Sequence, residues 1–135
     1  MDIFKGCKDI LLRHNNIIFA YIFGSYAQDK ARADSDVDIA LYLDTAMDVE
    51  TYLEIKVRLA EVCKREVDLI ILNEATPFLR YEVYRNNNLL FSRDKARETQ
   101  YKVKTLFEYS DMKKYLNLCY NETIRRLKEE VKSHS

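Results

Sequence analysis

Apolar and polar positions follow one another along the chain in blocks whose spacing predicts short strands and longer helices. The unbroken apolar run Ile17–Phe23 is rich in β-forming residues and is typical of a central strand buried on both faces. Residues 36–43 place apolar side chains at every second position, which predicts a strand with one face in the core. Similar patterns predict further strands over 67–72 and 89–91.

Between these strands, apolar residues recur every three or four positions and predict helices. The first helix is expected from Ile3 to Arg13, and the second is expected to begin at an N-cap, either Thr45 or Asp48. A third helix is expected to open near Thr76-Pro77 and to end in the asparagine run 86–88. The chain therefore mixes strands and helices in alternation.

The tail is predicted to be helical, with a break and a new N-cap at Ser110-Asp111. Each part carries an apolar stripe, and such stripes are more often core than binding site, although here they follow the last strand and can pack on the body or on a partner. The first stripe is Thr99, Val103, Leu106 and Phe107, and the second is Met112, Leu116, Tyr120, Ile124, Leu127 and Val131.

A length of 135 residues with 47% hydrophobic and 33% charged residues indicates one globular domain. We expect an α/β (α+β) fold with a short mixed sheet flanked by helices, a catalytic core over about 1–93 and a helical extension over about 94–133. The apolar runs are too short for a membrane span, and the first residues do not resemble a signal peptide. A cytoplasmic protein is therefore expected.

The three cysteines are widely spaced, and none belongs to a CxxC pair. A zinc site and a disulfide framework are therefore not expected. Cys63 and Cys119 fall on apolar helical stripes, which predicts that they are small buried side chains.

Charge is unevenly distributed along the chain. Residues 1–94 hold 12 basic and 16 acidic residues, whereas residues 95–135 hold 10 basic and 6 acidic residues, so the overall net charge is zero. A neutral chain disfavours direct nucleic-acid binding, because such binding depends on neutralising phosphates. The basic tail suggests a surface for something other than the acidic body, or simply a differently solvated face.

Polar residues at the ends of three predicted strands form the main candidate site. Gly24 and Ser25 end the first strand, where glycine permits a sharp turn and serine supplies a hydroxyl and a backbone N–H. Asp36 and Asp38 share one face of the next strand, and Asp68 lies second in what reads as another buried strand. Such carboxylates suit Mg²⁺, and three of them on adjacent strands suit two-metal nucleotidyl transfer.

The segment from Gly24 to Asp38 resembles the signature of the DNA polymerase β nucleotidyltransferase superfamily and is most similar to the minimal nucleotidyltransferase (MNT) family. The tail from Arg97 through Asp111 and onward is also similar to the end of MNT proteins encoded beside HEPN-domain ribonucleases. The resemblance implies a polymerase β-like fold and an antitoxin that uses ATP and Mg²⁺ to attach AMP to a tyrosine of a HEPN-domain ribonuclease toxin.

The resemblance also implies a role for individual residues. Two Mg²⁺ ions would be held by the carboxylates, Asp68 would help activate the incoming hydroxyl, and ATP phosphates would lie against the turn after the first strand. The implied metal ligands are Asp36, Asp38 and Asp68, and the implied nucleotide-binding residues are Gly24, Ser25 and Ser35, the last beside the metals.

The loop departs from the family pattern at Gln28-Asp29, where the family often has a basic residue followed by glycine. Lys30 or Arg32 can replace the missing cationic phosphate contact, because a charge on a flexible stem suits phosphate. Both residues are equally consistent with an ordinary solvated loop.

Three other functions fit parts of the pattern. The chain can neutralise a ribonuclease by binding alone, but binding does not require three carboxylates. Nucleotidyl transfer to a small molecule generally needs a second substantial domain, which we do not expect in 135 residues unless a partner chain supplies it. Transfer to an RNA 3′ end is weakened by the neutral charge.

Overall fold

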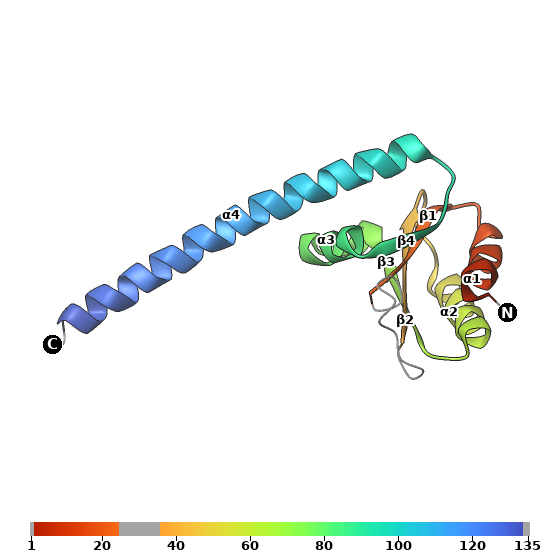
Figure 1. Ribbon diagram of the computed structural model, residues 1–135, viewed down its shortest axis with the longest axis horizontal. Helices are drawn as coiled ribbons and strands as arrows, with labels where there is room; N and C mark the ends of the chain where they lie inside the picture. Colours follow the sequence, from red (N-terminus) through yellow and green to blue (C-terminus); the bar gives the residue numbers. More distant parts are fainter. Residues whose placement is uncertain (1, 25–35, 134–135) are drawn as a thin grey trace.

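The computed structural model describes residues 2–24 and 36–133, which form a four-stranded sheet with helices packed on both faces (Figure 1). The elements along the chain are α1 (Ile3–Leu12), β1 (Ile17–Phe23), β2 (Val37–Leu43), α2 (Val49–Cys63), β3 (Val67–Ile71), the 3₁₀ turn η1 (Leu72–Glu74), α3 (Pro77–Arg85), β4 (Asn87–Ser92) and α4 (Lys95–Ser133). The predicted elements through β4 are all present, with boundaries shifted by one or two residues.

The strand order is β3-β2-β1-β4. β1 pairs antiparallel with both β2 and β4, whereas β2 and β3 run parallel. The parallel pair is possible because α2 carries the chain back to the starting end of β2 before β3 begins. The expected short mixed sheet is therefore confirmed, and β1 is central and buried along its whole length, as predicted.

One face of the sheet, which we call the α1–α2 face, is covered by these two helices and is almost entirely aliphatic. α2 starts at Asp48, whose carboxylate accepts a hydrogen bond from the Thr51 backbone N–H at 2.7 Å, so Asp48 and not Thr45 is the N-cap. The two helices approach closely where the buried sulfur atoms of Cys7 and Cys63 lie 3.5 Å apart as free thiols. This face forms the larger part of the hydrophobic core.

The opposite face, which we call the α3–α4 face, is aromatic and partly polar. The Phe19 and Tyr42 rings stack with centroids 4.7 Å apart, and the Tyr101 ring packs on both. The Tyr21 hydroxyl donates to the buried carboxylate of Glu98. Burial alone would raise the pKa of Glu98, but this bond and the nearby ammonium groups of two lysines hold it below its usual value.

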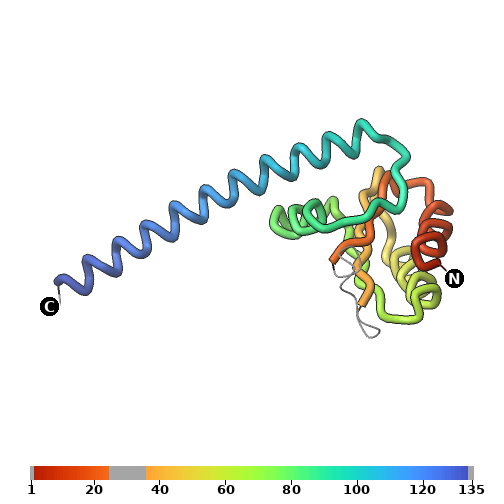
Figure 2. The backbone as a smooth tube through the Cα atoms, viewed as in Figure 1, coloured from red at the N-terminus to blue at the C-terminus, as the bar shows by residue number. Residues whose placement is uncertain are grey.

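The tail is one continuous helix of 39 residues, so the predicted break at Ser110-Asp111 is wrong. Both of those side chains are exposed, so they need not compete with the helical backbone bonds. No glycine or proline interrupts the sequence from 95 to 133, so no residue forces an end. α4 passes alongside α3 and then extends well beyond it, away from the sheet (Figure 2).

The apolar stripes of the tail do not form the core of this chain. Val103, Leu106 and Phe107 are exposed, and the buried residues of α4 are instead Glu98, Tyr101 and Thr105. The apolar pattern did not predict the buried side of α4, because a polar residue can be buried when it has a hydrogen-bond partner. Glu98 has such a partner in the Tyr21 hydroxyl.

Two further observations concern the tail and the helices. Cys119 is exposed, so the expectation that it is buried is wrong, whereas Cys63 is buried as predicted.

Within residues 2–24 and 36–133, no helix has the length and apolar character needed to cross a membrane.

Candidate active site

The two carboxylates of the parallel strand pair stand side by side at the end where both strands begin. Asp38 of β2 is in register with Asp68 of β3, and hydrogen-bonded strands lie roughly 4.8 Å apart. Neighbours in register point to the same face, and here that is the α3–α4 face, because Asp38 has the same parity as Ala40 and Tyr42. The sequence-based prediction did not specify this direct pairing.

Gly24 lies beside the Asp38 carboxylate at the end of β1. It directly follows β1, whose last residue, Phe23, is paired with Asp38. Its backbone has a φ of +74°, and a Cβ atom there would lie 2.5 Å from Oδ2 of Asp38. Glycine is therefore required at this turn both by its conformation and by the close approach of the carboxylate.

The carboxylates repel one another. Partial burial, followed by the charges of Asp68 and Asp36, raises the pKa of Asp38 above its ordinary value. Asp36 precedes β2 and is exposed. A concentration of negative charge that raises the pKa of a carboxyl in this way is relieved by a bound cation.

The donor set fits a hard divalent cation such as Mg²⁺, because all three groups are carboxylates. Among the residues that the structure describes, no three acidic, cysteine or histidine side chains are already arranged as a metal site. Asp38 and Asp68 would hold the ion from paired strands, with Asp36 reaching it from the adjoining loop. The fit rests on the carboxylate chemistry and on the mutual repulsion seen at Asp38.

Four predicted nucleotide contacts, Ser25, Lys30, Arg32 and Ser35, lie outside the described residues. Asp68 is placed as predicted on a third strand, but the premise that it is buried is wrong, since its side chain is exposed. β3 is an edge strand, which explains why a carboxylate is tolerated there without a buried partner.

Sequence reasoning missed the contribution of α3 to the site. The backbone N–H of Gly24 donates to the carbonyl of Asn86, the C-cap of α3, at 3.3 Å. Phe23 also pairs with Asn87, whose side-chain amide donates to the carbonyls of Val83 and Tyr84 at 2.9 Å. The asparagine run, interpreted only as a helix stop, therefore fixes the turn that carries Gly24.

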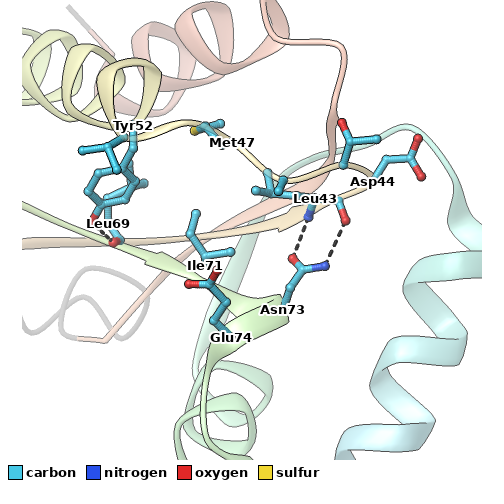
Figure 3. A pocket seen from close by; sticks show the side chains of 11 residues that line it. Leu43, Asp44, Met47, Tyr52, Leu69, Ile71, Asn73 and Glu74 are labelled. Carbon is cyan, nitrogen blue, oxygen red and sulfur yellow. Dashed lines mark hydrogen bonds between the residues drawn. The ribbon is translucent and has the colours of Figure 1, made fainter.

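A hollow of about 540 Å³ lies at the other ends of β2 and β3 (Figure 3). Apolar side chains including Leu43, Leu69 and Ile71 line it on the α1–α2 face. The Asn73 side chain accepts a hydrogen bond from the Leu43 backbone N–H at 2.8 Å and donates one to the Leu43 carbonyl at 2.9 Å. None of the three carboxylates lines this hollow, which is therefore separate from the candidate active site.

Comparison with known families agrees with this geometry. Residues 5–96 match the family described as "Polymerase beta, Nucleotidyltransferase". The protein adenylyltransferase MntA of Shewanella oneidensis is 31% identical over 104 residues, which cover 76% of this chain and 74% of that protein. The chain therefore belongs to the polymerase β nucleotidyltransferase family, which confirms the resemblance, and it is a nucleotidyltransferase by class.

Solved structures extend the likeness of fold beyond the family match. A toxin–antitoxin structure with AMP-PNP matches with a TM-score of 0.79 at 23% identity, covering 90% of this chain and 98% of that one. An MNT antitoxin in complex with the tri-AMPylated HEPN toxin of S. oneidensis matches with a TM-score of 0.69 at 20% identity and similar coverage. A candidate minimal nucleotidyltransferase matches with a TM-score of 0.56 and covers only 65% of this chain but 95% of its own.

Proposed function

We propose that this chain is an antitoxin that transfers AMP from ATP to a tyrosine hydroxyl of a HEPN-domain ribonuclease toxin and thereby silences it. The observation that carries the proposal is the in-register pair of Asp38 and Asp68 beside the Gly24 turn, with Asp36 near enough to raise the pKa of Asp38. It is supported by the name of the S. oneidensis relative, a protein adenylyltransferase, and by the related antitoxin structure with an AMPylated HEPN toxin.

In the proposed reaction the tyrosine oxygen forms a bond to the α-phosphorus of ATP. The bond from that phosphorus to the bridging oxygen breaks, pyrophosphate leaves, and the hydroxyl loses its proton. Asp68, whose side chain is exposed on β3, is proposed to help activate the hydroxyl. Two Mg²⁺ ions bound to the carboxylates would supply charge neutralisation for the phosphates.

The remaining predicted contacts keep their proposed roles. Gly24 and Ser25 would lie against the ATP phosphates, with Ser35 beside the metals and Lys30 or Arg32 as the cationic contact. Because ATP is the donor and the three cysteines are free thiols, we place the protein in the cytoplasm.

The test uses ATP labelled separately at the α and γ phosphates, with Mg²⁺, this chain and its purified cognate ribonuclease. We expect only the α label to appear on the ribonuclease, and to disappear in the Asp36→Asn/Asp38→Asn double variant. The matched control is Asp44→Asn, because Asp44 lies just beyond the far end of β2 and pairs with Arg97 at 2.9 Å.

Other results point to the other functions. Label on RNA would indicate RNA tailing, and label on a small molecule would indicate a modifying enzyme. Tight binding of the ribonuclease without any label would indicate an antitoxin that acts by docking alone. Each of these results contradicts the proposed reaction.

A further inference from the structure

α4 consists of two parts with different surroundings. Residues 95–112, which we call the anchored half, are held to the body by several side chains. Glu108 pairs with Arg80 of α3 at 3.0 Å, and the rings of Tyr109 and Tyr81 stack at 3.6 Å. From residue 113 to Val131, the described hydrogen bonds and ion pairs join residues of α4 only. We call residues 113–131 the free half, which extends about 30 Å.

The free half is amphipathic although nothing in the described chain covers it. Apolar residues recur every three or four positions along one side and form the α4 stripe, which consists of Leu116, Tyr120, Ile124, Leu127 and Val131. Tyr120 is 66% exposed and Val131 is 70% exposed. Another side of the helix carries ion pairs from Arg125 to Glu122 and Glu129 at 2.6 and 2.8 Å. The ion-paired side is suited to exposure to water, whereas the apolar stripe is not.

A helix of this length derives most of its stability from burying an apolar side, since helix formation alone is marginal in water. The α4 stripe continues the side of the helix that packs on α3 in the anchored half, because Tyr109, which stacks on Tyr81 of α3, precedes Leu116 and Tyr120 at helical spacing. The surface is therefore the continuation of an existing helix–helix interface beyond the end of α3.

Two observations indicate what covers it. Residues 113–133 hold six basic and three acidic residues, so the same segments of two copies would repel each other, and a partner with acidic groups is favoured. The family match ends at residue 96, and the candidate minimal nucleotidyltransferase lacks a counterpart for about a third of this chain. Two matches cover 90% of this chain and so extend into α4, and both come from toxin–antitoxin structures.

We propose that the α4 stripe docks the ribonuclease that the active site modifies, in an apolar groove with acidic side chains at its rim. This inference rests on the proposed function. Docking along the helix would hold the acceptor tyrosine near the carboxylates and raise its effective concentration. The stripe would thus set the KM for the ribonuclease, while the carboxylates set kcat.

Cys119 provides a direct probe in the unaltered chain. It lies on the free half between Leu116 and Tyr120 and is exposed, whereas Cys7 and Cys63 are buried. We expect iodoacetamide to modify Cys119 readily in the isolated chain and at least tenfold more slowly when the cognate ribonuclease is saturating. Equal rates with and without the ribonuclease would overturn the proposal.

A matched pair of substitutions separates docking from helix stability. Leu127→Ser alters the stripe, and Leu118→Ser makes the same change at a residue that is 69% exposed and lies away from the stripe on the same helix. We expect Leu127→Ser to raise the KM for the ribonuclease at least fivefold with kcat unchanged, and Leu118→Ser to change it less than twofold. Equal effects from the two variants would contradict the proposed surface.

The remaining outcomes are also decisive. If the isolated chain is a dimer in light scattering and Cys119 is protected without the ribonuclease, a second copy covers the stripe and the proposal is wrong. If the ribonuclease binds through the stripe but receives no label from ATP, the proposed function fails while the docking surface stands. Label transfer that is insensitive to Leu127→Ser would give the reverse result.

Discussion

The two faces of the sheet solve different problems. The α1–α2 face buries aliphatic side chains and the thiols of Cys7 and Cys63, with little that ionises. The α3–α4 face carries Asp38 together with the Tyr21–Glu98 bond and a stacked aromatic cluster. The first face supplies the burial that stabilises the fold. Because the first face provides this stability, the second face can hold carboxylates that repel one another. A bound cation would relieve that repulsion.

Replacing a carboxylate of the α3–α4 face tests this division most strongly. We expect Asp38→Asn to reduce AMP transfer at least about 100-fold, because it removes a negative ligand from the proposed metal site. The fold should survive, since the change removes a charge whose neighbours raise its pKa. Initial rates and circular dichroism measure the two effects, with Asp44→Asn as the control. Wild-type rates in the Asp38 variant would contradict the assignment.

Two glycines allow the same substitution on opposite faces. In Gly24→Ala the added methyl group meets Asp38 Oδ2 at a backbone φ of +74°, so we expect at least a tenfold loss of activity. In Gly6→Ala it meets Val62 Cγ1 at 2.5 Å between α1 and α2, so we expect about 1–2 kcal/mol of lost stability with activity per folded molecule retained. Urea unfolding and transfer rates at 20 °C distinguish these results. Equal losses of activity per folded molecule in the two variants would contradict the expected difference between the faces.

A pair of tyrosines sharpens the description of the α3–α4 face. Tyr21→Phe deprives the buried Glu98 carboxylate of a donor and should cost about 1–3 kcal/mol. The Tyr101 hydroxyl lies near Thr105 but is buried without a partner at bonding geometry among the described residues. Tyr101→Phe should therefore be neutral within about 0.5 kcal/mol or stabilising. Chemical denaturation of both variants measures the difference. A larger cost at Tyr101 would show that its hydroxyl has a partner.

The smallest expected effect is the pH dependence of Glu98. Its pKa is lowered in the fold, so its contribution to stability is complete above the unfolded pKa near 4.3 and is lost as the pH falls through the folded pKa. Glu98→Gln lacks this contribution at every pH. We expect the variant to be less stable than the wild type by about 1 kcal/mol at pH 7 and the gap to narrow by pH 3. A gap that is constant with pH would exclude the ionised form as the cause.

The sequence was sufficient to predict the elements through β4, because strand and helix periods there match simple burial. It also predicted Asp38 and Asp68 on neighbouring strands, whereas Asp36 precedes β2 and does not share its face as expected. The roles of these carboxylates stay a prediction. The sequence could not reveal the register that pairs Asp38 with Asp68, because pairing depends on contacts far apart in sequence.

The tail was the least predictable part. Ser110-Asp111 is a good N-cap pattern, but exposed polar residues are equally tolerated inside a helix. Its apolar stripe was interpreted first as core, because periodicity cannot tell an intramolecular interface from one with a partner. The buried Glu98 was missed for a similar reason, since its donor, Tyr21, is 77 residues away.

The most direct test of the account is whether neutralisation needs chemistry as well as binding. The activity of the cognate ribonuclease on RNA would be measured after incubation with excess chain and Mg²⁺, with and without ATP, and with the Asp36→Asn/Asp38→Asn variant. We expect ribonuclease activity to be lost only with ATP and intact carboxylates, and to stay lost after the chain is removed. Full neutralisation by the double variant, or without ATP, would contradict the account.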